Sequence, residues 1–213
     1  MNVIVVIPAH NEGKTIGGVV SRTLSHGRVI VVDDYSSVNT DQEASMAGAF
    51  MVLRNQINLG YDKSLDKGFA VAASKALKAD IIVTMDGDGE HDPADIERII
   101  KPIILNYADI VCGTRPTLSR WSETIFAFYT RLRFGIHDPL CGFKAYKREV
   151  YDAVGYFDRS NSIGTELMLT GVRKGYRVAN VPIRLHPRAD ASRFYSSSLR
   201  GNLRILKALA RGL

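Results

Sequence analysis

The chain has 213 residues, of which 46% are hydrophobic, and this is enough to bury one substantial core in a single domain. The formal net charge of +6 comes from residues 184–213, where seven basic side chains accompany one acidic side chain. Because these cations lie beside an apolar stripe, the charge does not indicate nucleic-acid binding. The two cysteines lack disulfide or zinc-site spacing, which fits a reducing compartment such as the cytoplasm. No apolar run approaches the roughly 18 residues of a membrane-spanning helix.

Strand and helix patterns alternate along the first half of the chain. Their short spacing is typical of parallel strands joined by crossover helices, and it predicts an α/β fold. The first strand pattern ends where Pro8 interrupts it. The strand patterns cover residues 3–7, 28–32, 49–53, 80–84 and 109–113, and helical patterns run through Leu24, from 58–61 to about Leu77, and over 165–172.

Polar residues follow three of these predicted strands. The segments 10–12, 33–37 and 86–90 each come directly after an apolar run. In open parallel sheets, ligands bind beyond the carboxyl ends of the strands. We therefore expect these three segments to meet in one crevice.

Acidic residues occupy alternate positions in the segment MDGDGEHDP, residues 85–93. Glycines separate Asp86, Asp88 and Glu90 and allow a tight turn. Mg²⁺ and Mn²⁺ prefer carboxylate oxygen and keep positions open for substrate phosphates, so this turn suits a metal–diphosphate site. A solvated Asp/Gly turn is the alternative interpretation.

Six motifs carry a family resemblance: IPAHNE (7–12), VVDDYSS (31–37), NLGYDKSLDKGFAVAA (58–73), MDGDGEHDP (85–93), CGTR (112–115) and DPLCGFKAYKR (138–148). Their order and spacing resemble family 2 glycosyltransferases of the GT-A fold, and most of all the polyprenyl-phosphate hexosyltransferases such as the dolichol-phosphate mannose synthases. The resemblance covers roughly residues 2–193. It implies an α/β GT-A fold with a mostly parallel central sheet flanked by helices. We expect a catalytic domain over residues 1–197 and a basic amphipathic helix over 198–213.

The resemblance implies a nucleotide-sugar donor, GDP-mannose or UDP-glucose, and Mg²⁺ or Mn²⁺ held by Asp88 and Glu90. Two positions depart from the family's usual residues: His10 stands where tyrosine is usual, and Glu90 where glutamine is common. The extra carboxylate favours tighter metal binding. His10 either stacks on the base or is an ordinary polar lining residue. The residues implied for donor binding are Pro8, His10, Glu12, Val32, Asp34, Asp86, Gly87, Asp88, Arg115, Arg188 and Arg193.

Arginines supply the cations that the resemblance requires. Arg115 follows a predicted strand and corresponds to an arginine that meets phosphate oxygens in the family, while Arg188 and Arg193 resemble a basic pair that closes over the donor. The usual spacing of that pair is one residue longer. Arginine suits this role because its planar fork grips phosphate and stays charged. Without the motifs, each would be interpreted as a surface arginine.

The acceptor decides whether a base is needed. A phosphate monoester is largely ionised at pH 7 and attacks the sugar carbon directly, whereas a glycan or glycolipid hydroxyl requires a general base. Asp138 and Glu166 are the candidate bases, and either residue is equally suited to a capping or ion-pair role. Cys141 is expected to line the acceptor pocket. The expected catalytic residues are Arg115, Asp88 and Asp138.

Two amphipathic segments suggest contact with a membrane. Residues 199–213 place leucines on one helical stripe and four basic residues on an adjacent stripe, as in helices that lie on anionic membranes. Residues 118–134 have an apolar stripe that includes Trp121, with Arg131 and Arg133 beside it as candidate contacts for a lipid phosphate. A packed terminal helix and core packing are the alternatives. We expect a peripheral protein on the cytoplasmic face, and the sequence does not indicate its oligomeric state.

The leading hypothesis is a metal-dependent polyprenyl-phosphate hexosyltransferase, and a hydroxyl-directed glycosyltransferase is the nearest rival. A sugar nucleotidyltransferase would need a glycine-rich N-terminal loop with Arg and Lys, but residues 7–14 read IPAHNEGK. The acidic triplet and Arg115 argue against a non-catalytic nucleotide-sugar binder.

Overall fold

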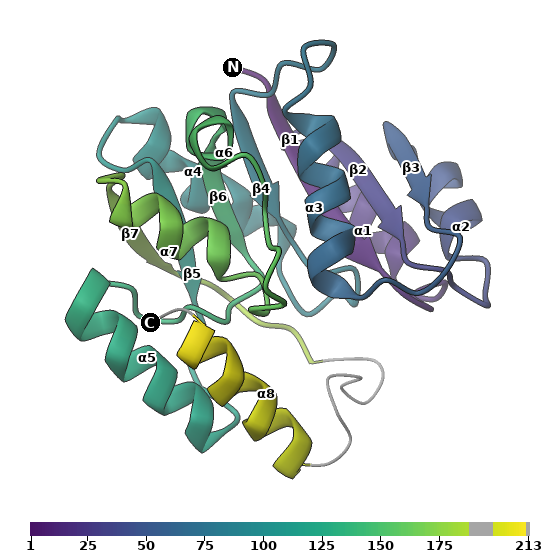
Figure 1. Ribbon diagram of the computed structural model, residues 1–213. Coiled ribbons are helices and arrows are strands. Elements are labelled where there is room, and N and C mark those ends of the chain that lie inside the picture. The colour runs from purple at the N-terminus through teal and green to yellow at the C-terminus, as the bar shows by residue number, and fades with distance from the viewer. Residues whose placement is uncertain (188–197, 212–213) are drawn as a thin grey trace.

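One mixed sheet forms the centre of the protein, which is shown as a computed structural model in Figure 1. The structure describes residues 1–187 and 198–211. In that part of the chain, seven strands pair in the order β3-β2-β1-β4-β6-β5-β7. All pairs are parallel except those of β6, which is antiparallel to both neighbours. The mostly parallel α/β sheet expected from the sequence is therefore confirmed. The strands are β1 (Val3–Ala9), β2 (Arg28–Asp33), β3 (Met51–Arg54), β4 (Ile81–Thr84), β5 (Ile110–Thr114), β6 (Lys144–Lys147) and β7 (Val178–Pro182).

Helices cover both faces of the sheet because alternate strand residues point to opposite sides. In β1, Val5 packs in a core with one group of helices and Ile4 packs in a separate core with the other group. The group that packs with Val5 contains α1 (Ile16–Thr23), α2 (Thr40–Met46) and α4 (Ile96–Ile104), which follows the short helix η1 (Pro93–Asp95). The group that packs with Ile4 contains α3 (Tyr61–Ala72), α5 (Trp121–Phe134), α6 (Arg148–Val154), α7 (Glu166–Arg173) and α8 (Ser198–Arg211).

Several predicted boundaries differ from the structure, most of them by one or two residues, and two differences have a physical explanation. The first strand continues through Pro8 to Ala9, because pairing with β4 ends at Val6 and only β2 still pairs with β1 at Pro8, so the missing N–H is tolerated. The third helix ends at Ala72 and not near Leu77. Beyond Ala72 the chain continues in turns, in which the Ser74 carbonyl accepts from the N–H groups of Leu77 and Lys78, and Lys78 adopts a positive φ of 49°.

Helices α5 and α8 pack against each other beside the sheet (Figure 1). The Ser122 hydroxyl donates to Asn202 Oδ1 at 2.5 Å, and Ile205 and Ala208 of α8 are buried. The helix expected at the C-terminus is therefore present and docked by one face. Among the described residues, no helix is long and apolar enough to cross a membrane.

Candidate active site

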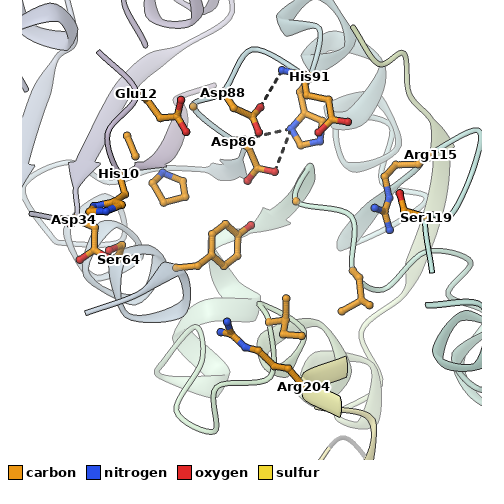
Figure 2. Close-up of a pocket in the computed structure, with 18 of the residues that line it drawn as sticks. His10, Glu12, Asp34, Ser64, Asp86, Asp88, His91, Arg115, Ser119 and Arg204 are labelled. Atoms are coloured by element: carbon orange, nitrogen blue, oxygen red, sulfur yellow. Dashed lines mark hydrogen bonds and ion pairs between the residues drawn. The ribbon is translucent and has the colours of Figure 1, made fainter. Parts of the chain in front are cut away.

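A cavity of about 470 Å³ lies beyond the carboxyl ends of β1, β2 and β4 (Figure 2). The segments that follow these strands supply His10, Asp34 and Asp86, as the strand pattern predicts. On the other side, the wall comes from the residues after β5, the start of α5 and one turn of α8. The lining residues are Pro8, Ala9, His10, Glu12, Asp34, Tyr61, Ser64, Asp86, Gly87, Asp88, Glu90, His91, Arg115, Ser119, Arg120, Glu123, Leu140, Gly142, Ile163, Arg204 and Ile205.

Asp34 braces one wall of this cavity. Its Oδ1 accepts from the Asn55 amide at 2.9 Å and the Leu59 N–H at 2.8 Å, and its Oδ2 accepts from the Gly60 N–H at 2.7 Å. The Asp34 carbonyl also lies 2.8 Å from His10 Nδ1. Asp34 therefore fixes both the loop that opens α3 and the imidazole that faces the cavity.

The acidic turn after β4 is joined to its neighbours by hydrogen bonds. The Thr15 hydroxyl lies 2.9 Å from the Gly87 carbonyl and 3.0 Å from the Glu12 carboxylate, and the Glu90 N–H donates to Asp88 Oδ1 at 3.0 Å. A Cβ at Gly142 would lie 2.4 Å from Asp86 Oδ2, so only glycine allows this close approach. The turn thus holds its carboxylates at the cavity in a defined arrangement.

His91 contacts the acidic turn at Asp86 from the core side. Its ring is buried against Phe143, with 5.2 Å between ring centroids. Its Nδ1 lies 3.3 Å from the Asp86 N–H and 3.8 Å from Asp86 Oδ2 (Figure 2). The shorter contact is a hydrogen bond that Nδ1 accepts from the Asp86 backbone, so His91 braces the turn.

The carboxylates of Asp88 and Glu90 fit a hard divalent cation whose remaining ligands come from the substrate. Asp88 and Glu90 both line the cavity, and both offer oxygen ligands. Within residues 1–187 and 198–211, no group of three or more His, Cys, Asp or Glu side chains could hold a metal ion alone. A pair of carboxylates suits Mg²⁺ or Mn²⁺, which commonly take their remaining ligands from water and substrate phosphates.

Arg115 lies on the opposite side, in a network of carboxylates. Its Nε and Nη2 donate to the two oxygens of Asp138 at 2.8 and 2.9 Å, and Nη2 also donates to Glu123 at 3.0 Å. Burial alone would lower the pKa of Arg115, but the hydrogen bonds and charge of Asp138 raise it well above its ordinary value. Arg115 is therefore a fixed cation on the cavity wall.

The cavity contains nine of the residues predicted for the site: Pro8, His10, Glu12, Asp34, Asp86, Gly87, Asp88, Glu90 and Arg115. Val32 is fully buried in the sheet core, and Asp138 lies behind Arg115. Cys141 is also fully buried, and burial raises its thiol pKa well above the usual value. Arg188 and Arg193 lie outside the described residues.

Three further candidates lie away from the cavity. Arg131 and Arg133 are exposed towards the end of α5. Glu166 accepts hydrogen bonds from the backbone of Arg159 and from both the backbone and hydroxyl of Ser160. Burial raises the pKa of Glu166, but these hydrogen bonds lower it overall. Glu166 therefore stabilises its own loop.

Several lining residues were missed by the sequence interpretation: Tyr61, His91, Arg120, Glu123 and Arg204. Tyr61 and His91 lie within the motifs at residues 58–73 and 85–93, and this position is the sequence signal that points to them. Burial raises the pKa of Tyr61 well above its ordinary value, and the charge of nearby Asp86 adds to this, so its hydroxyl stays neutral. No sequence pattern links Arg120 and Arg204 to the strand ends. The packing of α5 and α8 brings these two arginines to the cavity.

A family model described as "Glycosyl transferase family 2" matches residues 4–155 of the chain. The chain belongs to glycosyl transferase family 2. It is accordingly a glycosyltransferase, and it takes its sugar from a nucleotide-sugar donor.

Two similar proteins carry names that specify a polyprenyl-phosphate acceptor. The chain is 26% identical over 206 residues to an undecaprenyl-phosphate mannosyltransferase of Micrococcus luteus, covering 86% of this chain and 83% of the relative. It is 28% identical over 214 residues to a UDP-N-acetylglucosamine–dolichyl-phosphate N-acetylglucosaminyltransferase of Methanococcus voltae, covering 85% and 84%.

A solved structure shares the fold. Glucosyl-3-phosphoglycerate synthase of Mycobacterium tuberculosis, in complex with Mn²⁺, UDP and glucosyl-3-phosphoglycerate, superposes with a TM-score of 0.74 at 18% identity. The match covers 99% of this chain and 79% of the synthase. The GT-A fold implied by the sequence motifs is therefore confirmed.

Proposed function

We propose that this glycosyltransferase transfers a hexose from GDP-mannose or UDP-glucose to a polyprenyl phosphate at the cytoplasmic face of a membrane. Asp88 and Glu90 hold Mg²⁺ or Mn²⁺ in this proposal, and the metal offsets negative charge on the donor diphosphate when bound. Pro8, His10 and Glu12 form the nucleotide side of the cavity. Arg115 is placed to meet phosphate oxygens on the other side.

One observation carries the choice of acceptor: the helices that wall the cavity beside Arg115 also expose apolar side chains. Ser119, Arg120 and Glu123 line the cavity at the start of α5, and Arg204 and Ile205 line it from α8. The outward stripe of α5 contains Trp121, Ile125, Phe128 and Leu132, and α8 adds Leu199 and Leu203, all between 46% and 79% exposed. Exposed apolar stripes with tryptophan are typical of surfaces that lie in a membrane interface.

Basic side chains border these stripes. Arg131 and Arg133 are exposed on α5, and Arg200, Lys207 and Arg211 are exposed on α8. Such cations attract anionic lipid headgroups. A membrane-resident acceptor would therefore lie next to the basic side of the cavity.

A phosphate acceptor needs no general base, and this fits a site in which both candidate bases already have other partners. The phosphate oxygen of the acceptor is already ionised at neutral pH, so transfer needs alignment and charge neutralisation but no base. Both candidate bases are engaged, Asp138 with Arg115 and Glu166 with the backbone of its own loop. This favours the phosphate acceptor over a glycan or glycolipid hydroxyl, which would need one of them as base.

The relatives support the same choice, since two of them carry polyprenyl-phosphate transferase names. The metal is supported by the synthase structures, which hold Mn²⁺ or Mg²⁺ together with UDP. These matches do not identify the nucleotide-sugar that this enzyme uses.

The test is a panel of nucleotide-sugars offered with undecaprenyl or dolichyl phosphate, with Mn²⁺, Mg²⁺ or excess chelator. We expect lipid-linked sugar from GDP-mannose or UDP-glucose, and only with metal. A parallel panel offers free glycans and glycolipids. Product only in that second panel would replace the proposal by the hydroxyl-acceptor alternative.

A further inference from the structure

Charges in the cavity are divided between two ends. Carboxylates gather at the end formed by the turns after β1, β2 and β4, whereas the other end combines three arginines, Arg115, Arg120 and Arg204, with the carboxylate of Glu123. Figure 2 shows Arg204 across the cavity from Asp86 and Asp88. One end therefore suits a metal and a nucleotide, and the other suits a second anion.

Arg204 differs from the other cations of α8. Its side chain is 30% exposed, whereas Arg200, Lys207 and Arg211 are on the exposed surface of the helix. The next residue, Ile205, is buried and also lines the cavity. The hydrogen bond between Ser122 and Asn202 fixes this turn of α8 against α5. Packing of the helix thus presents the Arg204 guanidinium to the cavity.

Arg120 is held at the same junction. Its guanidinium lies against Gly201 of α8, where a Cβ would come within 2.9 Å of Nη1. Its Nε is 4.0 Å from Glu123 Oε1. Two arginines from helices distant in sequence therefore converge on one end of the cavity, and docking of α8 positions both.

We infer that Arg120 and Arg204 bind the phosphate of the acceptor, and that α8 completes this anion site by docking on α5. The inference rests on the proposed function and names the acceptor contacts of that site. Guanidinium groups suit a phosphate monoester because they offer paired N–H donors and stay charged. Ile205, Leu140 and Ile163 line the same cavity and offer apolar contact to the first prenyl unit.

A purely structural role for Arg204 makes a different prediction. Its Nη2 lies 3.5 Å from Oδ2 of Asp62, whose side chain is only 2% exposed. If Arg204 serves only to neutralise this buried carboxylate, then Asp62→Asn should repair the defect of Arg204→Gln. If Arg204 binds the acceptor, removal of the Asp62 charge cannot replace the lost cation.

The experiment uses the full chain with farnesyl phosphate, a short acceptor that needs no membrane, and with farnesol as the acceptor lacking phosphate. Binding is measured by calorimetry and transfer by steady-state kinetics, for wild type, Arg204→Gln, Arg204→Lys, Arg120→Gln, Asp62→Asn and the double variant Asp62→Asn/Arg204→Gln. Lys75→Gln, which removes an exposed cation elsewhere, is the matched control. Thermal melting verifies that each variant is folded.

We expect Arg204→Gln and Arg120→Gln each to raise the Kd and KM for farnesyl phosphate by about 10-fold or more, with the donor KM unchanged. The double variant should be as weak as Arg204→Gln, Arg204→Lys should recover part of the loss, and farnesol should not bind. Wild-type affinity in Arg204→Gln, or full repair by Asp62→Asn, would overturn the inference.

The outcome also separates this inference from the proposed function. Sugar transfer to polyprenyl phosphate with no effect of either arginine would leave the function intact and remove only the anion site. Absence of farnesyl phosphate binding in wild type, with transfer to a hydroxyl acceptor, would overturn both.

Discussion

Asp138 and Arg115 form a bidentate ion pair in which the carboxylate lies behind the guanidinium. Both Asp138 oxygens accept side-chain hydrogen bonds from Arg115, and the Arg115 backbone N–H donates to the same group at 3.1 Å. Asp138 is only 1% exposed. A general base must reach the proton it removes, and here the arginine occupies that side. We therefore interpret Asp138 as a positioning residue for Arg115.

This relationship predicts a modest loss for Asp138→Asn. The amide keeps the shape but removes the charge that orients Arg115, so we expect kcat to fall by about 10-fold, less than the roughly 10²–10⁴-fold effect of a lost base. Because an arginine stays protonated across the working pH range even without a carboxylate partner, the pH–rate profile should keep its shape. Arg115→Ala should cost more than Asp138→Asn.

Glu166→Gln is the companion measurement, and it should have little effect on kcat because Glu166 lies outside the cavity. Loss of an acidic limb from the pH–rate profile in Asp138→Asn or Glu166→Gln would contradict this assignment. It would instead identify that carboxylate as a base and favour a hydroxyl acceptor.

Removal of the Asp88 carboxylate tests the metal end of the cavity. Asp88→Ala should abolish metal-dependent transfer, while the free energy of unfolding changes by about 1 kcal/mol or less, because the residue lies on a partly exposed turn. Excess chelator should reproduce the loss with the wild-type chain. Asp152→Asn, which alters an exposed ion pair on α6, is the control. Full transfer by Asp88→Ala, or with chelator, would rule out the metal assignment.

The layout of the sheet and the acidic end of the cavity could be predicted from the sequence. Apolar strand runs have a clear periodicity, and the polar residues that follow parallel strands must meet at one edge, as His10, Asp34 and Asp86 do. The basic end depends on how two helices dock. Nothing in the local pattern of α8 distinguishes Arg204, which lines the cavity, from Lys207, which is exposed.

The same limit applies to individual roles. Asp138 looks like a candidate base in sequence because its pairing with Arg115, 23 residues away, depends on tertiary structure. Asp34 looks like a ligand contact, yet Asn55, Leu59 and Gly60 occupy its oxygens. Composition reveals which charges exist, but only packing determines which of them neutralise one another.

Asp62 makes stability depend on pH. Burial is the main cause that raises the pKa of Asp62 to about 6 in the folded protein, and the charge of Asp158 is the second cause. In the unfolded chain the pKa of an aspartate is about 3.9. Between these values the folded protein holds the extra proton. The contribution of Asp62 is therefore fully present below about pH 4 and is lost as the pH rises through about 6. Asp62→Asn should remove this dependence.

Urea unfolding of wild type and Asp62→Asn at pH 4 to 7 provides the measurement. The free energy of unfolding of the variant, relative to wild type, should increase by about 2 kcal/mol across this range. A difference that stays constant with pH would show that Asp62 keeps an ordinary pKa in the folded protein.

Trp121 provides a direct probe of the proposed membrane surface, because it is the only tryptophan in the chain and is 57% exposed on α5. If α5 and α8 lie in the interface, its fluorescence should shift to the blue when phosphatidylserine vesicles are added. Lipids brominated on their acyl chains should quench it. Vesicles of neutral lipid should bind more weakly, since the basic border would lose its partner.

The charged border of α8 should account for much of this affinity. Each basic residue near an anionic surface contributes roughly 1 kcal/mol, so changing Arg200, Lys207 and Arg211 together to Gln should weaken vesicle binding by about 100-fold. Arg204 is left intact because it lines the cavity, and metal-dependent donor hydrolysis should therefore be unchanged. The charge-matched control changes three exposed cations elsewhere: Arg22, Lys75 and Lys78. Equal losses in both triple variants would mean that net charge alone causes binding, and unchanged Trp121 fluorescence would mean that the exposed stripes do not enter the membrane.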